Sequence, residues 1–113
     1  MEKIEYLPLG SIVYLKEGTK KLIVIARGLL VKNGDEFVYF DYGGVPYPEG
    51  LQGDKMAYFQ HDAITKVIFK GFSDYDDEVT VEKINNFVEK NPEIKRGVVD
   101  ELLNTKKINT DVM

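Results

Sequence analysis

The first part of the chain alternates short apolar segments with turn residues, which is the pattern of β-strands. Residues 12–15 follow a Pro-Leu-Gly turn signal, and residues 22–26 form a continuous apolar run after a second turn. Residues 29–42 contain Asn33-Gly34 between two β-forming segments. Asn-Gly is a strong hairpin signal, because the central residues of a type I′ turn need positive φ. The pattern therefore predicts an antiparallel hairpin over 29–42 and one strand before it at 12–15, with the 22–26 run continuing through a bulge or bend at Arg27-Gly28 into the first hairpin strand.

Residues 43–55 interrupt this pattern. They hold four glycines and two prolines in thirteen residues, so we expect an irregular loop and not a strand. Loops of this length in compact domains are often functional. Two further strands are predicted at 56–60 and 64–69, with a short connection between them.

The apolar period changes to that of a helix in the last third of the chain. Val81, Ile84 and Val88 recur at helical spacing, and Thr80 can serve as the N-cap. This spacing predicts a helix that covers one face of the sheet.

A second helix is expected directly after the first. Asn91 can cap it, with Pro92 at its first helical position, and an apolar face continues beyond. The two helices together span 79–104. Residues 105–113 are mostly polar, and we expect them to fray.

These elements predict the α+β fold class in a single domain over 1–113. About five antiparallel strands occupy 1–73, as a meander or a barrel-like curl, and two C-terminal helices follow. The change from strands to helices marks no boundary between two domains.

The composition excludes several kinds of functional site. The chain is 43% hydrophobic and 30% charged, which is typical of globular proteins and argues against disorder. It has no cysteine, which excludes disulfides and thiolate metal sites, and one histidine, which excludes a site of several histidines within one chain. No phosphate-loop motif is present. We expect no cofactor, no metal site and no catalytic residue.

Charge is unevenly distributed along the sequence. Residues 1–73 balance nine acids with nine bases, whereas residues 74–113 hold ten acids and six bases and supply the net charge of −4. Such a chain has no basic cluster for phosphates, so we expect no nucleic-acid partner. Its longest apolar run is too short to insert into a membrane.

Two polar features could still be functional. The acidic residues of 74–78 are interpreted as a solvated linker before a helix, with a docking or cation site as the alternative. His61 and Asp62 could form a general base with an orienting carboxylate, and Asp41 or Glu49 could lie near them. We favour a turn histidine, because no positioned nucleophile accompanies the pair.

Aromatic residues give the stronger indication of function. Seven tyrosines and phenylalanines lie between residues 37 and 59, beside the Pro/Gly-rich loop. They could be core residues, or part of a surface that binds a protein, since tyrosine offers large contact area at low entropic cost. The second hypothesis assigns partner binding to residues of this loop and of the last helix: Tyr42, Val45, Tyr47, Pro48, Leu51, Val99 and Leu103.

Four segments resemble a known family. They are residues 7–22 (LPLGSIVYLKEGTKKL), residues 40–50 (FDYGGVPYPEG), residues 59–64 and residues 67–72. The sequence is similar to small domains of unknown function encoded in type VII secretion loci of Gram-positive bacteria (Firmicutes), beside LXG-type toxins. The resemblance covers about residues 5–80.

This resemblance implies a non-enzymatic accessory, a chaperone or targeting factor for an LXG-type toxin. The partner would be a secreted toxin or a small helical secretion protein of the same locus, with a homodimer as a further possibility. A cytoplasmic location is implied, and the N-terminal residues fit it because they lack the features of a signal peptide. The alternatives are an immunity protein that neutralises a toxin and, least favoured, a small enzyme using His61 and Asp62.

Overall fold

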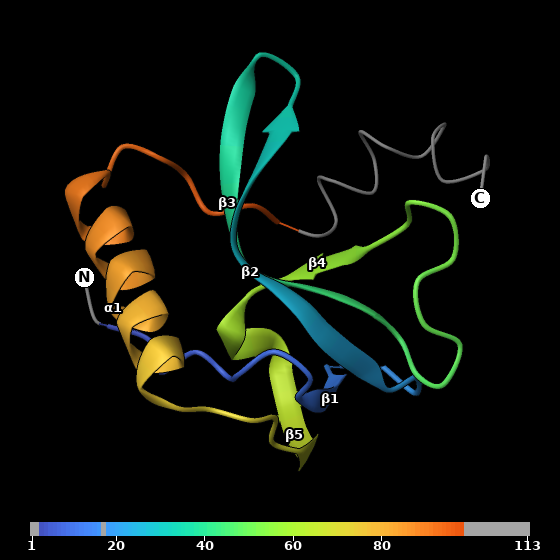
Figure 1. Ribbon diagram of the computed structural model, residues 1–113. Helices are drawn as coiled ribbons and strands as arrows, with labels where there is room; N and C mark the ends of the chain where they lie inside the picture. Colours follow the sequence, from blue (N-terminus) through green and yellow to red (C-terminus); the bar gives the residue numbers. More distant parts are fainter. Residues whose placement is uncertain (1–2, 17, 99–113) are drawn as a thin grey trace.

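The computed structural model describes residues 3–16 and 18–98, and it contains an antiparallel five-stranded sheet with one α-helix (Figure 1). The order of the strands in the sheet is β4-β3-β2-β1-β5. The elements in chain order are β1 (Ile12–Leu15), β2 (Leu22–Asn33), β3 (Glu36–Pro46), β4 (Ala57–Phe59), the 3₁₀ helix η1 (His61–Ala63), β5 (Ile64–Phe69) and α1 (Tyr75–Lys90). The predicted α+β class is confirmed.

The predicted meander topology is confirmed for β1 to β4, which lie side by side in chain order, but it is wrong for β5. β5 pairs with β1 at the opposite edge from β4, although residues 60–63 alone connect them. A flat sheet would separate these edges by about 19 Å, and so short a connection spans at most about 18 Å when extended. The sheet is therefore strongly curved, but it stays open, since no pairing of β4 with β5 occurs among the described strands.

The central hairpin is confirmed and is longer than predicted. Asn33 pairs with Glu36, so Gly34 and Asp35 form the two-residue turn, with Gly34 at φ +68. β2 continues without a break from Leu22. The register shifts by one residue at Ile25, as expected of a bulge.

β3 contradicts the prediction that the loop begins at residue 43. Gly43 and Gly44 continue the strand and pair with β2, and the loop begins only after Pro46. A Cβ at Gly43 would lie 2.6 Å from the sulfur of Met56, and one at Gly44 would lie 2.9 Å from a backbone oxygen of β2. These glycines therefore allow close packing inside the sheet.

Helix α1 begins six residues earlier than the predicted cap at Thr80 implies. Asp74 is the N-cap, and its side chain accepts a hydrogen bond from the backbone N–H of Asp77. The 74–78 segment is thus the cap and first turn of the helix and not a linker, because carboxylates there interact favourably with the helix dipole. The predicted face is confirmed, since Val81 and Ile84 pack on the main core.

The second helix is absent from residues 91–98, and that prediction is wrong there. Residues 95–97 instead run beside β3 as a parallel bridge: the Tyr39 N–H donates to the Lys95 carbonyl, and the Gly97 N–H donates to the Tyr39 carbonyl. Gly97 also packs so tightly on the ring of Phe40 that no side chain would fit. Tertiary contacts override the helical spacing. Residues 99–104 and the predicted frayed tail lie outside the described residues.

The core consists of two clusters along the curved sheet. The main cluster contains Tyr6, Val13, Val24, Tyr42 and Phe59, and α1 and the N-terminal segment cover it. The second contains Val31, Val38 and Phe40 in the hairpin. Asn85 of α1 exchanges two hydrogen bonds with the backbone of Ile4, which holds the N-terminal segment in place.

Candidate functional site

Asp41 is the centre of a buried polar network. It lies in β3 between two aromatic residues, and its side chain is almost completely buried. Its Oδ1 accepts hydrogen bonds from the Tyr6 hydroxyl (3.0 Å) and from Arg96 Nη1 (2.6 Å), and its Oδ2 accepts one from the His61 backbone N–H (2.7 Å). A buried carboxylate is costly unless its oxygens are satisfied, and here both are.

Two tyrosines extend the network under the N-terminal segment. The Tyr6 and Tyr39 hydroxyls lie 2.7 Å apart. Tyr6 gives its only hydroxyl proton to Asp41, so Tyr39 donates to Tyr6. This chain of bonds joins the segment before β1 to the middle of β3.

Gln60 and Arg96 bring the end of the described chain into the same network. Gln60 Oε1 accepts hydrogen bonds from the Asp41 N–H and from Arg96 Nη1, and Gln60 Nε2 donates to the carbonyls of Tyr39 and Gly97. The Arg96 guanidinium also lies over the Tyr39 ring, 5.1 Å from its centre. Together these bonds hold residues 95–97 against the sheet.

The His61 side chain contacts Tyr42 and not Asp62, the carboxylate predicted to orient it. Its Nδ1 lies 2.7 Å from the Tyr42 hydroxyl, which also accepts a hydrogen bond from the Leu7 N–H, and the two rings stack. Asp62 is exposed in η1. The predicted proximity of Asp41 to His61 is confirmed, although the contact uses the His61 backbone, whereas Glu49 pairs with Lys20 in the loop.

The tyrosines of the network are held in their neutral form. Burial raises the pKa of Tyr42 to about 12, and it raises the pKa values of Tyr6 and Tyr39 as well. Burial opposes the charge of Arg96, but the hydrogen bond to Asp41 and the charge of Asp41 outweigh it, so the pKa of Arg96 is raised. These shifts move protonation changes further from neutral pH, opposite to what a general acid or base needs.

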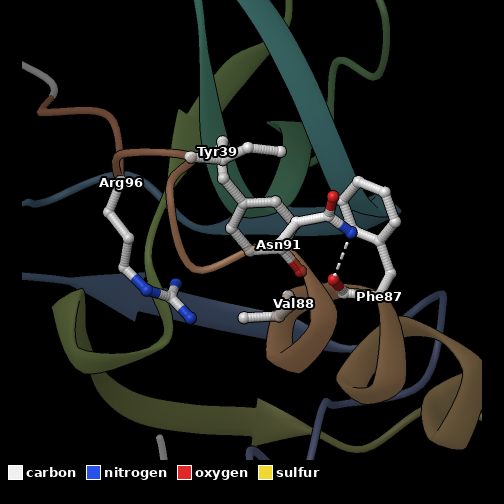
Figure 2. A pocket seen from close by; sticks show the side chains of 6 residues that line it. Tyr39, Phe87, Val88, Asn91 and Arg96 are labelled. Carbon is white, nitrogen blue, oxygen red and sulfur yellow. Dashed lines mark hydrogen bonds between the residues drawn. The ribbon is translucent and has the colours of Figure 1, made fainter.

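A small pocket adjoins the network between α1 and β3. It is lined by Tyr39, Phe87, Val88, Asn91, Ile94 and Arg96. Figure 2 shows the Asn91 side chain turned back to the helix end, where its amide nitrogen donates to the Phe87 carbonyl over 2.8 Å. The pocket is largely apolar. No group of three or more metal-ligating side chains occurs within residues 3–16 and 18–98.

The structure divides the predicted partner-binding residues. Tyr42 and Val45 are buried in the core of β3, so their side chains cannot contact a partner, and their assignment is corrected. Tyr47, Pro48 and Leu51 are exposed on the loop after β3. Val99 and Leu103 lie outside the described residues.

The loop of residues 47–55, called the 47–55 loop below, is exposed but well anchored. The Tyr47 N–H donates to the Lys21 carbonyl, and the Gly50 N–H donates to the Pro46 carbonyl. Lys20 Nζ lies 2.7 Å from a carboxylate oxygen of Glu49, and this hydrogen bond lowers the pKa of Glu49. These hydrogen bonds and this ion pair therefore hold Tyr47 and Leu51 on a defined backbone. The Tyr47–Pro48 peptide bond within it is cis.

The acidic segment is largely committed to the fold. Asp74 caps α1, and Asp77 lies 2.7 Å from Arg27 Nη2 in a pair whose side chains are only 6% and 15% exposed. Asp76 and Glu78 stay exposed. The segment thus offers less free charge for docking than its composition suggests.

Comparison with known families gives one match. The sequence profile of a domain of unknown function, DUF4176, matches residues 6–80. The chain belongs to the DUF4176 family. No curated protein and no solved structure matches it.

The DUF4176 match includes most of the buried network. Tyr6, Asp41 and Gln60 lie inside the matched region, whereas Arg96 lies beyond it. Sequence reasoning missed Gln60 and Arg96 as members of the network. One signal was available: an acidic residue within the apolar strand sequence Phe40-Asp41-Tyr42 must find partners if the strand is buried.

No helix within residues 3–16 and 18–98 of the DUF4176 chain is long and apolar enough to cross a membrane.

Proposed function

We propose that the chain is a non-enzymatic, protein-binding accessory of type VII secretion, a cytoplasmic chaperone or targeting factor for an LXG-type toxin. The observation that carries the binding role is the pair of exposed apolar side chains on the anchored 47–55 loop. Tyr47 is 40% exposed and Leu51 is 57% exposed. The secretion context rests on the resemblance of residues 7–22, 40–50, 59–64 and 67–72 to domains encoded in such loci.

The loop has the physical properties of a binding element. Backbone bonds at Tyr47 and Gly50, and the ion pair of Glu49, restrict it before a partner arrives. Less conformational entropy is then lost on association, which increases affinity. Tyrosine and leucine beside Pro48 supply apolar contact area, and the Lys21 ammonium lies 5.5 Å from the Tyr47 ring centre.

The buried network supports a structural role for the remaining polar groups. Asp41 is fully hydrogen-bonded, His61 is joined to Tyr42, and the tyrosine pKa values are raised away from neutral pH. Each of these groups therefore has a role in folding. This arrangement favours a binding role over the enzyme alternative.

Co-expression with the neighbouring secretion genes tests the proposal. The tagged chain should co-purify with the helical N-terminal part of the toxin, and the Tyr47→Ala/Leu51→Ala variant should lose it at an unchanged unfolding midpoint. Asp62→Ala is the matched control. It changes an exposed residue outside the loop, so this variant should still co-purify with the toxin. Failure to co-purify with any locus-encoded protein would remove the proposal.

The immunity alternative has a separate readout. Cells that produce the toxin's active domain should die whether or not this chain is present. Survival that depends on this chain, and on Asp76 and Glu78, would replace the chaperone role by immunity.

A further inference from the structure

The small pocket between α1 and β3 is the centre of a larger apolar surface. Tyr39 lines the pocket, and the register of the hairpin places Leu30 directly opposite Tyr39. Phe37 lies two residues before Tyr39 in the same strand. Side chains that are directly opposite, or two residues apart in one strand, lie on the same face of a sheet. Leu30 and Phe37 therefore lie beside the pocket, on the face of the hairpin that Tyr39 occupies.

The helix and the segment after it form the other side of this surface. Phe87 and Val88 of α1 and Ile94 after it line the pocket, and Figure 2 shows the Phe87 and Val88 side chains around it. We call the pocket together with Leu30, Phe37 and Phe87 the α1–hairpin surface. Leu30 is 44% exposed, Phe37 is 56% exposed and Phe87 is 40% exposed. The surface is thus hollow at its centre and apolar on both sides.

The size of the pocket fits a side chain better than a whole small molecule. Its empty volume is about 260 Å³, whereas small-molecule sites have about 300–1,000 Å³. A peptide segment that places one apolar side chain in the pocket, and others against Leu30 and Phe37, would cover the surface. Peptides that bind in grooves use apolar anchors in this way.

Lysines flank the α1–hairpin surface on both sides. Lys32 pairs with Phe37 in the hairpin and therefore lies on the same face. Lys83 lies four residues before Phe87 in α1 and Lys90 three residues after it, so both are its neighbours on the helix surface. All three lysines are exposed, and none has an ion-pair partner in the part of the chain that the structure describes.

Most acidic residues of α1 lie away from this surface. Asp76 is on the side of Phe87 but three helical turns before it, about 16 Å along the axis. Glu93 is exposed in the turn after α1 and offsets part of the positive charge. Three exposed glutamates lie about half a turn around the helix from Phe87, at about 3.6 residues per turn: Glu78, Glu82 and Glu89. The lysines are thus gathered at one side of α1, although the whole chain has a net charge of −4.

Arg96 gives the pocket a group that can bind a carboxylate. Within the described residues, both hydrogen bonds of the Arg96 side chain use Nη1, which donates to Asp41 and Gln60. Nη2 and Nε can therefore donate to an incoming group, and an arginine fork of this kind matches the two oxygens of a carboxylate. The Arg96 side chain is 33% exposed, so such a group can reach it.

These observations indicate the chemistry of the occupant. We propose that the α1–hairpin surface binds an acidic segment of a partner protein that also carries apolar side chains. One apolar side chain fills the pocket, others contact Leu30 and Phe37, and carboxylates face Arg96 and the lysines. An anionic membrane would match the charge, but a flat lipid surface cannot place a group in a pocket between α1 and the hairpin.

The proposal goes beyond the proposed function and does not depend on it. Figure 1 shows α1 on one side of the molecule and the 47–55 loop, in green, on the other. The two surfaces can therefore be occupied at the same time, and each can be changed without the other.

Two labelled synthetic peptides test the proposal. Each is about 14 residues long, or four helical turns, and has leucines at helical spacing. The first carries glutamates at the remaining positions, and the second carries lysines there. Fluorescence anisotropy measures the binding of each peptide to the full chain at protein concentrations up to about 500 µM, which detects a Kd of that order.

The variants separate a defined site from general charge attraction. Lys32→Glu/Lys83→Glu reverses one lysine on each side of the α1–hairpin surface. Lys66→Glu/Lys70→Glu is the matched control, because it changes the net charge equally at exposed positions in β5 and just after it. Figure 1 shows β5 at the end of the molecule away from the hairpin tip. Phe37→Ser removes the most exposed aromatic side chain of the surface.

The glutamate peptide should bind the wild type, and the lysine peptide should not. Lys32→Glu/Lys83→Glu and Phe37→Ser should each weaken binding at least about tenfold, whereas the matched control should stay within about twofold of the wild type. The glutamate peptide should shift the amide NMR signals of residues 30–39 and 87–96 and not those of the 47–55 loop. Circular dichroism checks that each variant is folded.

Three results would overturn the proposal. They are no binding of the glutamate peptide, equal binding of the two peptides, and an equal loss of binding in the two charge-reversal variants. Binding of phosphatidylcholine–phosphatidylserine vesicles with the same dependence on Lys32 and Lys83, without binding of the peptide, would replace the protein partner by a membrane. None of these results bears on the 47–55 loop, so failure here is distinct from failure of the proposed function.

Discussion

The Asp41 network and the 47–55 loop each contain a tyrosine and an ion pair, but the two regions differ in burial. Asp41 and Arg96 form an ion pair at 2.6 Å, and Lys20 and Glu49 form one at 2.7 Å. The Asp41 side chain is 1% exposed, whereas both members of the loop pair are more than 40% exposed. The two ion pairs thus have nearly the same nitrogen–oxygen distance but differ in how far they are buried. A buried pair that loses one partner leaves a costly charge, whereas an exposed pair is replaced by water.

Tyr42 and Tyr47 show the same difference in burial. Tyr42 is 0% exposed, with its ring stacked on Phe59 and its hydroxyl bonded to Leu7 and His61. Tyr47, five residues later, is 40% exposed. We propose that the network supplies stability and that the loop supplies partner binding, and each experiment below tests that proposal.

The largest effect is expected from Asp41→Ala. The change leaves Tyr6, Arg96 and the His61 N–H without their buried acceptor, and we expect a loss of about 3–5 kcal/mol in the free energy of unfolding. Urea unfolding measures it. Asp62→Ala, an exposed carboxylate in η1, is the control and should change stability by less than about 0.5 kcal/mol. Equal effects from the two would refute a structural role for the network.

Alkaline pH should destabilise the fold through the buried tyrosines. The folded pKa of Tyr42 is about 12, above the ordinary value of 10.0, so the folded state retains a proton that the unfolded chain releases. Stability is complete below pH 10 and falls as the pH rises from 10 to 12. The slope is about 1.4 kcal/mol per pH unit for each such tyrosine, and Tyr6 and Tyr39 steepen it.

Urea unfolding at intervals from pH 9 to 12 checks this prediction. Tyr42→Phe should remove one tyrosine's share of the slope. A slope that is the same in Tyr42→Phe as in the wild type would show that Tyr42 is not shielded in the folded state.

A smaller effect is expected from Arg96→Lys. Lysine keeps the charge but cannot reproduce the planar guanidinium over Tyr39 together with its two hydrogen bonds, so we expect a loss of about 1–3 kcal/mol. Amide hydrogen exchange should become faster at Gly97 and Tyr39, whose N–H groups form the bridge. Unchanged exchange at both amides would contradict the role of Arg96 as an anchor of residues 95–97.

The smallest effect is expected from Lys20→Ala in the loop pair. Because both side chains are well exposed, water replaces the lost contact, and the urea midpoint should not move measurably. A clear loss of stability would show that the loop contributes to the fold and would weaken the division between the two regions.

Local sequence signals predicted the strands and the hairpin well. Asn33-Gly34 located the turn to within one residue, and Val81, Ile84 and Val88 gave the helix face, because both signals depend on neighbouring residues. The helix start was predicted too late because the apolar period begins only at Val81, whereas Asp74 caps the helix and Asp77 in its first turn pairs with Arg27, which is distant in the sequence.

The remaining errors come from contacts between distant residues. Helical spacing predicted a helix after Pro92, but the bonds of Arg96 to Asp41 and of Gly97 to Tyr39 span more than fifty residues. Gly43 and Gly44 suggested a loop, although Met56 and the backbone of β2 require them inside a strand. For the same reason the sequence could not show that Tyr42 is buried and Tyr47 is exposed.

The most direct test of the account measures binding and stability in the same variant. Tyr47→Ala/Leu51→Ala should keep the wild-type urea midpoint and weaken binding of the toxin's N-terminal part at least about tenfold, as expected when apolar anchors at an interface are lost. The account would be contradicted if this folded variant bound within twofold of the wild type.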